Sequence, residues 1–242
     1  MDEQSDMLIR KRSIRRCAGK CKNGMFLALG TVFLLGSAFC FQAREIQVAQ
    51  TKERESAMLK KVAITFDDGP NPDYTEQLLD GLKERGVEAT FFLLGKEAEK
   101  YPDIVERMSR EGHLIATHSY EHVNLCNLSD DEAIEQVDKT NDVLYQITGL
   151  YPEYIRPPFG CWKCNLDYET QMIEVLWDID PLDWKTQNAS VVAKRVINQV
   201  EENDIILLHD ASESSVEAAF EIIDSLKEEG YIFVTVDEIL FE

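Results

Sequence analysis

From residue 61 to residue 242, short apolar runs alternate with longer amphipathic stretches. The runs predict seven strands, at residues 62–66, 90–94, 114–117, 153–156, 174–178, 205–208 and 232–236. The stretches between them predict helices; two close at Gly86 and Gly112, and a third begins at Ser129 with a capping box to Glu132. Strands that alternate with helices favour a parallel sheet, and seven or eight such units favour a barrel, with an open doubly wound sheet as the alternative.

The first part of the chain has a different pattern. Seven Lys and Arg residues within residues 1–23 precede a charge-free apolar run at 24–42, which is long enough to cross a bilayer. We therefore expect a basic cytoplasmic tail at 1–23, a transmembrane signal anchor at 24–42, a polar stalk at 43–60 and a catalytic domain at 61–242. A cleaved signal peptide is the alternative, although residues 38–40 form a weak cleavage site. Either way the domain is expected outside the cytoplasm, held by a single membrane pass or secreted after cleavage.

The net charge of −20 is unevenly distributed along the chain. Residues 1–42 hold seven basic and three acidic residues, which leaves 18 basic and 42 acidic residues in the rest. Such an acidic body lacks the clustered Lys and Arg that bind a phosphate backbone. Nucleic acid is therefore not an expected partner.

Polar side chains follow five of the predicted strands directly. They are Asp67 and Asp68, His118 and His122, Arg156, Asp180 and Asp183, and His209. In barrels built from strand–helix units, reactive groups lie at the carboxyl ends of the strands, which meet at one rim. Chance supplies one or two such placements, whereas five strand ends favour a functional site.

The adjacent acids Asp67 and Asp68, together with His118 and His122 in the sequence HSYEH, predict a metal site. On a helical turn, a spacing of four puts both imidazoles on one face, and one carboxylate completes a three-ligand set with open positions for water. The other carboxylate can then take a proton from water whose pKa a metal lowers from about 15.7 to about 7. The alternatives are histidines on a solvated face and acids that cap a type I turn, but such a turn needs only one acid.

Arg156 and His209 are two further candidates. Arg156 opens the rigid segment RPPFG, which would direct a guanidinium at a carboxylate and a backbone N–H at an oxyanion; the alternative is a structural turn. For His209, burial would lower the pKa and a neighbouring acid would raise it, as suits a general acid; the alternative is a hydrogen-bonded core residue. His113 lies at the other end of its strand, where we expect it to pack or cap rather than bind metal.

Five motifs in order resemble those of polysaccharide deacetylases, carbohydrate esterase family 4. They are TFDDGP (65–70), HSYEH (118–122), RPPFG (156–160), DPLDW (180–184) and LLH (207–209), and the resemblance covers residues 61–242. It implies the NodB-homology fold, a distorted (β/α)7-type barrel. It also implies one divalent metal ion, usually zinc, with cobalt, nickel, iron and manganese as alternatives.

The resemblance also implies a role for individual residues. Asp68, His118 and His122 would bind the metal, Asp67 would be the catalytic base and His209 the catalytic acid. Arg156 would orient Asp67, Asp183 would tune His209, the backbone of Phe159 would hold the oxyanion, and Trp184 and Leu207 would wall the groove around the acetyl group. Phe159 stands where many relatives have tyrosine, but a main-chain N–H tolerates that change.

These roles imply a hydrolase that removes N-acetyl groups from an extracellular glycan. Because the predicted anchor puts the domain beside the cell wall, N-acetylglucosamine of peptidoglycan is the expected substrate. Chitin or chitooligosaccharides, N-acetylmuramic acid and O-acetylated xylan are the alternatives within the family. Two rivals lie outside it: an iron oxygenase with a two-His, one-carboxylate triad, which needs no paired acid, and a non-catalytic glycan-binding protein, which would lack a ligand or an acid.

Cys161 and Cys164 form a CxxC pair directly after RPPFG. Such a pair is typical of redox chemistry, half a zinc site or a small local disulfide. Because no second CxxC is expected on the same side of the membrane, we favour a local disulfide or packing thiols. Cys126 is interpreted as isolated.

Overall fold

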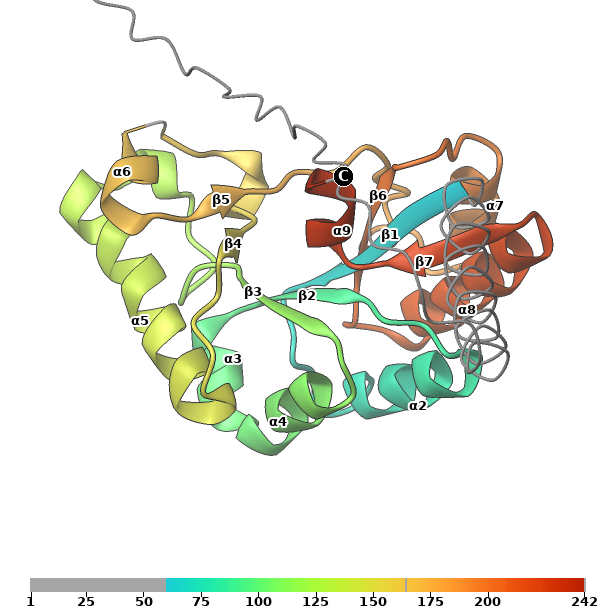
Figure 1. Cartoon of the computed structure of the whole chain (residues 1–242), viewed down its shortest axis with the longest axis horizontal. Helices are drawn as coiled ribbons and strands as arrows, with labels where there is room; N and C mark the ends of the chain where they lie inside the picture. Colours follow the sequence, from blue (N-terminus) through green and yellow to red (C-terminus); the bar gives the residue numbers. More distant parts are fainter. Residues whose placement is uncertain (1–59, 164, 242) are drawn as a thin grey trace, which may run out of the picture. The chain divides into compact units, whose positions relative to one another are not determined.

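Strand β1 (Lys60–Asp67) lies inside a parallel sheet in the computed structural model, which describes residues 60–163 and 165–241 (Figure 1). The other strands are β2 (Thr90–Leu93), β3 (Leu114–Thr117), β4 (Tyr154–Ile155), β5 (Ile173–Glu174), β6 (Ile205–His209) and β7 (Tyr231–Val234). They follow the order β5-β4-β3-β2-β1-β6, and β7 pairs with β1. Seven parallel strands were predicted from the apolar runs, and this prediction is confirmed.

β1 pairs with three strands at once. Its first half, Lys60–Ala63, pairs with β7, and its second half, Thr65–Asp67, pairs with β2. β6 pairs with Ala63–Asp67, and because Ala63 is matched to both β6 and β7, those two strands lie on opposite edges of β1. The carboxyl end of β1 therefore lies between the ends of β2 and β6, with Asp67 in register with His209.

The two faces of β1 have different partners. Val62, Ile64 and Phe66 belong to the largest hydrophobic cluster, which includes side chains of the covering helices. Thr65 and Asp67 point the other way, into the curled sheet, because the side chains of a strand alternate between faces. Because of this alternation, the side chain of Asp67 lies at the inner rim of the sheet.

The helices of the described chain connect the strands; the longer ones cover the outer face of the sheet, whereas Val236 of the last one packs against Ala63 and Phe92 on the inner face (Figure 1). They are α2 (Thr75–Arg85), α3 (Gly95–Lys100), α4 (Pro102–Arg110), α5 (Asp130–Thr148), α6 (Leu166–Thr170), α7 (Ala189–Ile197), α8 (Glu213–Glu228) and α9 (Val236–Leu240), with short 3-10 turns at Leu125–Asn127 and Pro158–Gly160. The predicted capping box is present: the hydroxyl of Ser129 accepts the N–H of Glu132, whose carboxylate accepts the N–H of Ser129. Gly86 caps α2 with a left-handed φ of 60°. His113 caps as expected, since its Nδ1 accepts the N–H of Ala89.

The sheet is curled, and its two edges are connected by an irregular segment rather than by a regular ladder. Residues 173–174 pair with β4, and Ile179 forms a single parallel bridge to Ile206 of β6. The strand predicted at 174–178 is therefore wrong beyond Glu174. The reason is a tertiary contact: the buried guanidinium of Arg156 binds the carbonyl oxygens of residues 175 and 176, so these oxygens do not take part in a strand ladder.

The predicted tail, anchor and stalk at residues 1–59 lie outside the described residues. Among the helices in residues 60–163 and 165–241, none has both the length and the apolar character needed to cross a bilayer.

Candidate functional site

Asp68 sits on a tight turn directly after β1. Its backbone is left-handed, with φ of 74°, and a cis Gly69-Pro70 bond follows. Ser119, His122 and Phe159, on two neighbouring loops, also have positive φ. Such conformations cost about 1–3 kcal/mol each for residues with a Cβ and tend to gather at functional sites. Residues with an unfavourable backbone conformation thus lie on three separate loops, and these loops meet near one point.

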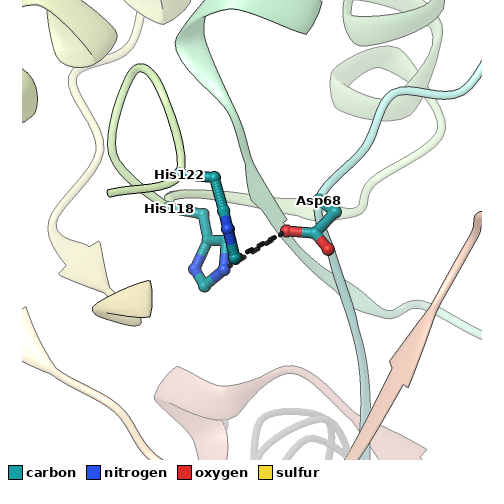
Figure 2. A group of neighbouring side chains, drawn as sticks. All are labelled: Asp68, His118 and His122. Carbon is teal, nitrogen blue, oxygen red and sulfur yellow. Dashed lines mark ion pairs between the residues drawn. The ribbon is translucent and has the colours of Figure 1, made fainter. Parts of the chain in front are cut away.

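The side chains of Asp68, His118 and His122 meet at that point (Figure 2). Oδ1 of Asp68 is 3.4 Å from Nε2 of His118 and 3.3 Å from Nε2 of His122. Asp68 Oδ1 is buried and has no hydrogen-bond donor among the described residues. His118 approaches Arg156 through Nδ1, which is 2.6 Å from the Arg156 carbonyl oxygen and donates to it, so the Nε2 lone pair faces Asp68.

This donor set fits a divalent cation. Two imidazole nitrogens and one carboxylate oxygen, all within 4.8 Å of one another, are the ligands of many three-residue metal sites with open positions. Burial lowers the pKa of His118, which favours the neutral ring that metal binding requires. The sequence argument was wrong on one point: residues 118–122 form a loop, not a helical turn, and the two imidazoles converge because Ser119 and His122 have positive φ.

Asp67 lies beside the three converging side chains but makes a different contact. Its Oδ1 accepts a hydrogen bond of 2.7 Å from Nη1 of Arg156, and its Oδ2 is 3.9 Å from Nε2 of His118. Arg156 is fully buried and also donates to the hydroxyl of Thr65, while its guanidinium lies 4.1 Å from the ring centroid of Phe92. The ion pair fixes one oxygen of Asp67 and leaves the other directed toward the histidines.

His209 and Asp183 form a second buried pair on the other side of β1. Nδ1 of His209 is 2.8 Å from Oδ1 of Asp183, and Oδ2 of the same carboxylate accepts the backbone N–H of His209. Burial alone would lower the pKa of His209, but the hydrogen bond and charge of Asp183 outweigh it and raise that pKa to about 9. The ring is therefore protonated at neutral pH and can donate a proton.

Asp67 and His209 both line one cavity, which has a volume of about 520 Å³. Its walls are formed by Asp67, Asp68, His118, His122, Pro157, Phe159, Trp177, Asp180, Trp184, Leu207 and His209. Of these residues, Phe159 and Trp184 are 67% and 61% exposed, whereas Leu207 is buried. The structure thus brings together all the predicted site residues. Arg156 and Asp183 do not line the cavity but contact Asp67 and His209, which do.

Sequence reasoning missed some neighbours of this cavity. Trp177 lines the cavity, although it is not among the site residues predicted from the sequence. Thr65 was not considered, although its position two residues before Asp67 puts both side chains on the same face of β1. That period of two was a signal that could have found it.

A disulfide joins Cys126 to Cys161, so the interpretation of Cys126 as isolated is wrong, and so is the expectation that Cys161 is a packing thiol or forms a local disulfide with Cys164. Cys126 follows His122 by four residues and Cys161 follows Phe159 by two, and the rings of His122 and Phe159 are in edge contact at 5.0 Å. The disulfide therefore ties the histidine loop to the RPPFG loop. Cys164 lies outside the described residues.

We expect the double variant Cys126→Ser/Cys161→Ser to lose about 3–4 kcal/mol of unfolding free energy, because the 35-residue separation no longer constrains the unfolded chain. Urea denaturation of the oxidised wild type, the reduced wild type and the variant measures this. The reduced wild type should match the variant. Equal stability of all three would contradict a disulfide between these cysteines.

Comparisons with known proteins agree with this geometry. The sequence profile of a family described as polysaccharide deacetylase matches residues 55–175. The chain is 43% identical over 180 residues to the peptidoglycan-N-acetylmuramic acid deacetylase PdaC of Bacillus subtilis, covering 74% of this chain and 38% of PdaC. It is 40% identical over 183 residues to a peptidoglycan-N-acetylglucosamine deacetylase of Bacillus cereus, covering 73% and 66%. The chain thus spans about two fifths to two thirds of the length of these relatives.

Solved structures give the same result. The structure of PdaC matches with a TM-score of 0.74 and 42% identity, covering 76% of this chain and 91% of that one. BA3943 of Bacillus anthracis, described as a CE4 family pseudoenzyme, matches with a TM-score of 0.71 and 30% identity, covering 76% and 66%. The fold is therefore shared by proteins with and without activity, and the side chains of the site must decide between them.

Proposed function

The chain belongs to the polysaccharide deacetylase family, and from this premise we propose that it is a metal-dependent hydrolase that removes N-acetyl groups from peptidoglycan N-acetylglucosamine. One observation carries the proposal: Asp68, His118 and His122 converge in the same cavity that contains Asp67 and a protonated His209. A non-catalytic glycan-binding protein would not need a complete set of metal ligands together with a proton acceptor, Asp67, and a proton donor, His209.

In the proposed reaction, Asp68, His118 and His122 hold a divalent cation, with zinc as the first choice. Such a cation acts as a Lewis acid and lowers the pKa of water to about 7. Asp67, oriented by Arg156, accepts the proton of the attacking water. The backbone N–H of Phe159 donates to the oxyanion that develops on the acetyl carbonyl. His209 gives its Nε2 proton to the departing amine, and Asp183 holds the ring in place.

The charges around the cavity favour N-acetylglucosamine over N-acetylmuramic acid. Among the residues that line the cavity, Asp67, Asp68 and Asp180 are acidic and none is Lys or Arg. The lactyl group of muramic acid carries a carboxylate where no peptide is attached. It would find no Lys or Arg among these residues, and the protonated ring of His209 is already paired with Asp183. The acidic charge of the whole chain adds long-range repulsion.

The function is tested by incubating the purified chain with peptidoglycan glycan strands and measuring released acetate. We expect acetate release that a chelator abolishes and added zinc restores. The control variant Asp73→Asn removes an exposed acid of the same loop and should behave as the wild type does. Oxygen consumption that depends on iron and a keto acid would favour the oxygenase instead, and glycan binding without acetate release would favour the non-catalytic alternative.

The substrate is tested in the same assay with chitooligosaccharides, acetylated xylan and muramic acid glycans that carry either a free or an amidated lactyl group. We expect the fastest release from N-acetylglucosamine units and slow release from the free lactyl form. Faster release from the free lactyl form at low ionic strength would contradict the charge argument and favour muramic acid, the substrate named for PdaC. A wall glycan as substrate is consistent with the extracytoplasmic location and the membrane anchor predicted at residues 24–42.

A further inference from the structure

Asp210, the residue after His209, has a buried carboxylate to which the reaction above assigns no role. It is 1% exposed. Burial raises the pKa of Asp210 to about 6, and the hydroxyl of Thr75 opposes that rise by donating a hydrogen bond to the carboxylate. The side chain is therefore charged at neutral pH in a place where charge is costly. A buried charge of this kind needs a reason in the local structure.

The carboxylate lies directly against the turn that carries Asp68. A Cβ placed on Gly69 would be 2.5 Å from Oδ2 and 2.9 Å from Oδ1 of Asp210, so the backbone of Gly69 packs on both oxygens. This close approach excludes any side chain at position 69. The turn and the end of β6 are thereby in contact, although their sequence positions differ by more than a hundred residues.

Thr75, the first residue of α2, joins the same turn to Asp210. Its hydroxyl accepts the N–H of Asn71 at 2.7 Å while donating to Oδ2 of Asp210, and its own N–H donates to the carbonyl oxygen of Asn71. Thr75 is fully buried. On the opposite side, the carbonyl oxygen of Gly69 accepts the N–H of Leu94, after β2. The turn is thus fixed from both neighbouring strands.

We propose that Asp210 and Thr75 are positioning residues that hold the turn at residues 68–71 so that Asp68 faces His118 and His122. Asp68 keeps its left-handed backbone because both ends of the turn are tied down, one to β2 and one to β6. The same link fixes the distance between the metal-binding turn and His209, since Asp210 follows His209 directly. The proposal rests on the proposed function only in taking Asp68, His118 and His122 as metal ligands.

Zinc binding by the metal-free protein tests this, measured by competition with a chromophoric chelator. Thr75→Val keeps the volume and removes the hydroxyl, and Asp210→Ala removes the carboxylate; each should weaken zinc binding by about 10-fold or more, as other residues that support metal ligands do. Thr75→Ser keeps the hydroxyl and should bind zinc as the wild type does. The double variant Thr75→Val/Asp210→Ala should be no weaker than Asp210→Ala, because both changes break one link.

Thr90→Val is the matched control. Thr90 is also fully buried, and its hydroxyl accepts the N–H of Val236 away from the site, so its loss should lower the melting temperature without changing the zinc Kd. Wild-type zinc affinity in folded Thr75→Val would overturn the proposal, and so would an equal loss in Thr90→Val. If Asp210→Ala does not fold, the comparison of Thr75→Val with Thr75→Ser decides. Failure of the wild type to bind zinc would refute the metal site itself, which is a separate result.

Discussion

Asp67→Asn should reduce kcat for acetate release by about 10²–10⁴-fold while zinc binding is retained. The amide has the shape of the carboxylate but cannot accept a proton at neutral pH. Asp67 is not among the three converging side chains, because its Oδ1 is engaged by Arg156 and its Oδ2 is 3.9 Å from His118. The loss should therefore fall on kcat, with the zinc Kd close to that of the wild type.

The measurement must separate chemistry from stability. Asparagine leaves Arg156 without its counter-charge, and breaking a buried ion pair by removing one partner costs about 3–5 kcal/mol. Arg156 still has three other acceptors, the hydroxyl of Thr65 and the carbonyl oxygens of residues 175 and 176, so the site should persist in the folded variant. Kinetics are therefore taken well below the melting temperature, beside Asp73→Asn. An Asp67→Asn protein with full metal-dependent activity would refute the assignment of the base.

The sequence was sufficient to predict which strand ends carry the site residues, because the strands are recognised from short-range patterns. Parallel strands predict that Asp67 and His209 lie at the same rim, and the two residues are in register. The ordered motifs added the pairing of His209 with Asp183, which periodicity alone does not show.

The rest could not be predicted because it depends on contacts between distant segments. The closeness of His118 and His122 was expected from a helix, but it arises from left-handed residues in a loop. The hydrogen bond from Thr75 to Asp210 and the disulfide between Cys126 and Cys161 could not be predicted, because each joins residues far apart in sequence and no periodic pattern of residues marks such contacts. Even the short fifth strand follows from a tertiary contact of Arg156.

Asp183→Asn should lower the pKa of His209 and shift the alkaline limb of kcat/KM to lower pH. Asp183 supplies the hydrogen bond and the charge that raise this pKa to about 9 against the opposing effect of burial, so an uncharged partner leaves burial to lower it. At neutral pH a smaller fraction of His209 then carries the proton for the leaving amine. His209→Gln removes the acid itself and should reduce kcat by about 10²–10⁴-fold.

The same pair should contribute a pH-dependent part of the stability. Because the pKa of His209 is raised above its ordinary value of 6.5, the contribution is fully present below about pH 6.5 and is lost as pH rises toward 9. Unfolding free energies of the metal-free wild type and Asp183→Asn should thus differ more at pH 6 than at pH 9.5.

Asp178→Asn is the matched control for Asp183→Asn, because Oδ2 of Asp178 accepts the N–H of Ile205 at 2.8 Å, just as Oδ2 of Asp183 accepts the N–H of His209. Both changes weaken a carboxylate contact to the backbone of β6, but only Asp183 touches the imidazole. The alkaline limb should therefore move in Asp183→Asn and stay in place in Asp178→Asn. An unshifted limb in Asp183→Asn would mean that a group other than His209 protonates the amine, and movement in both variants would trace the effect to β6 as a whole.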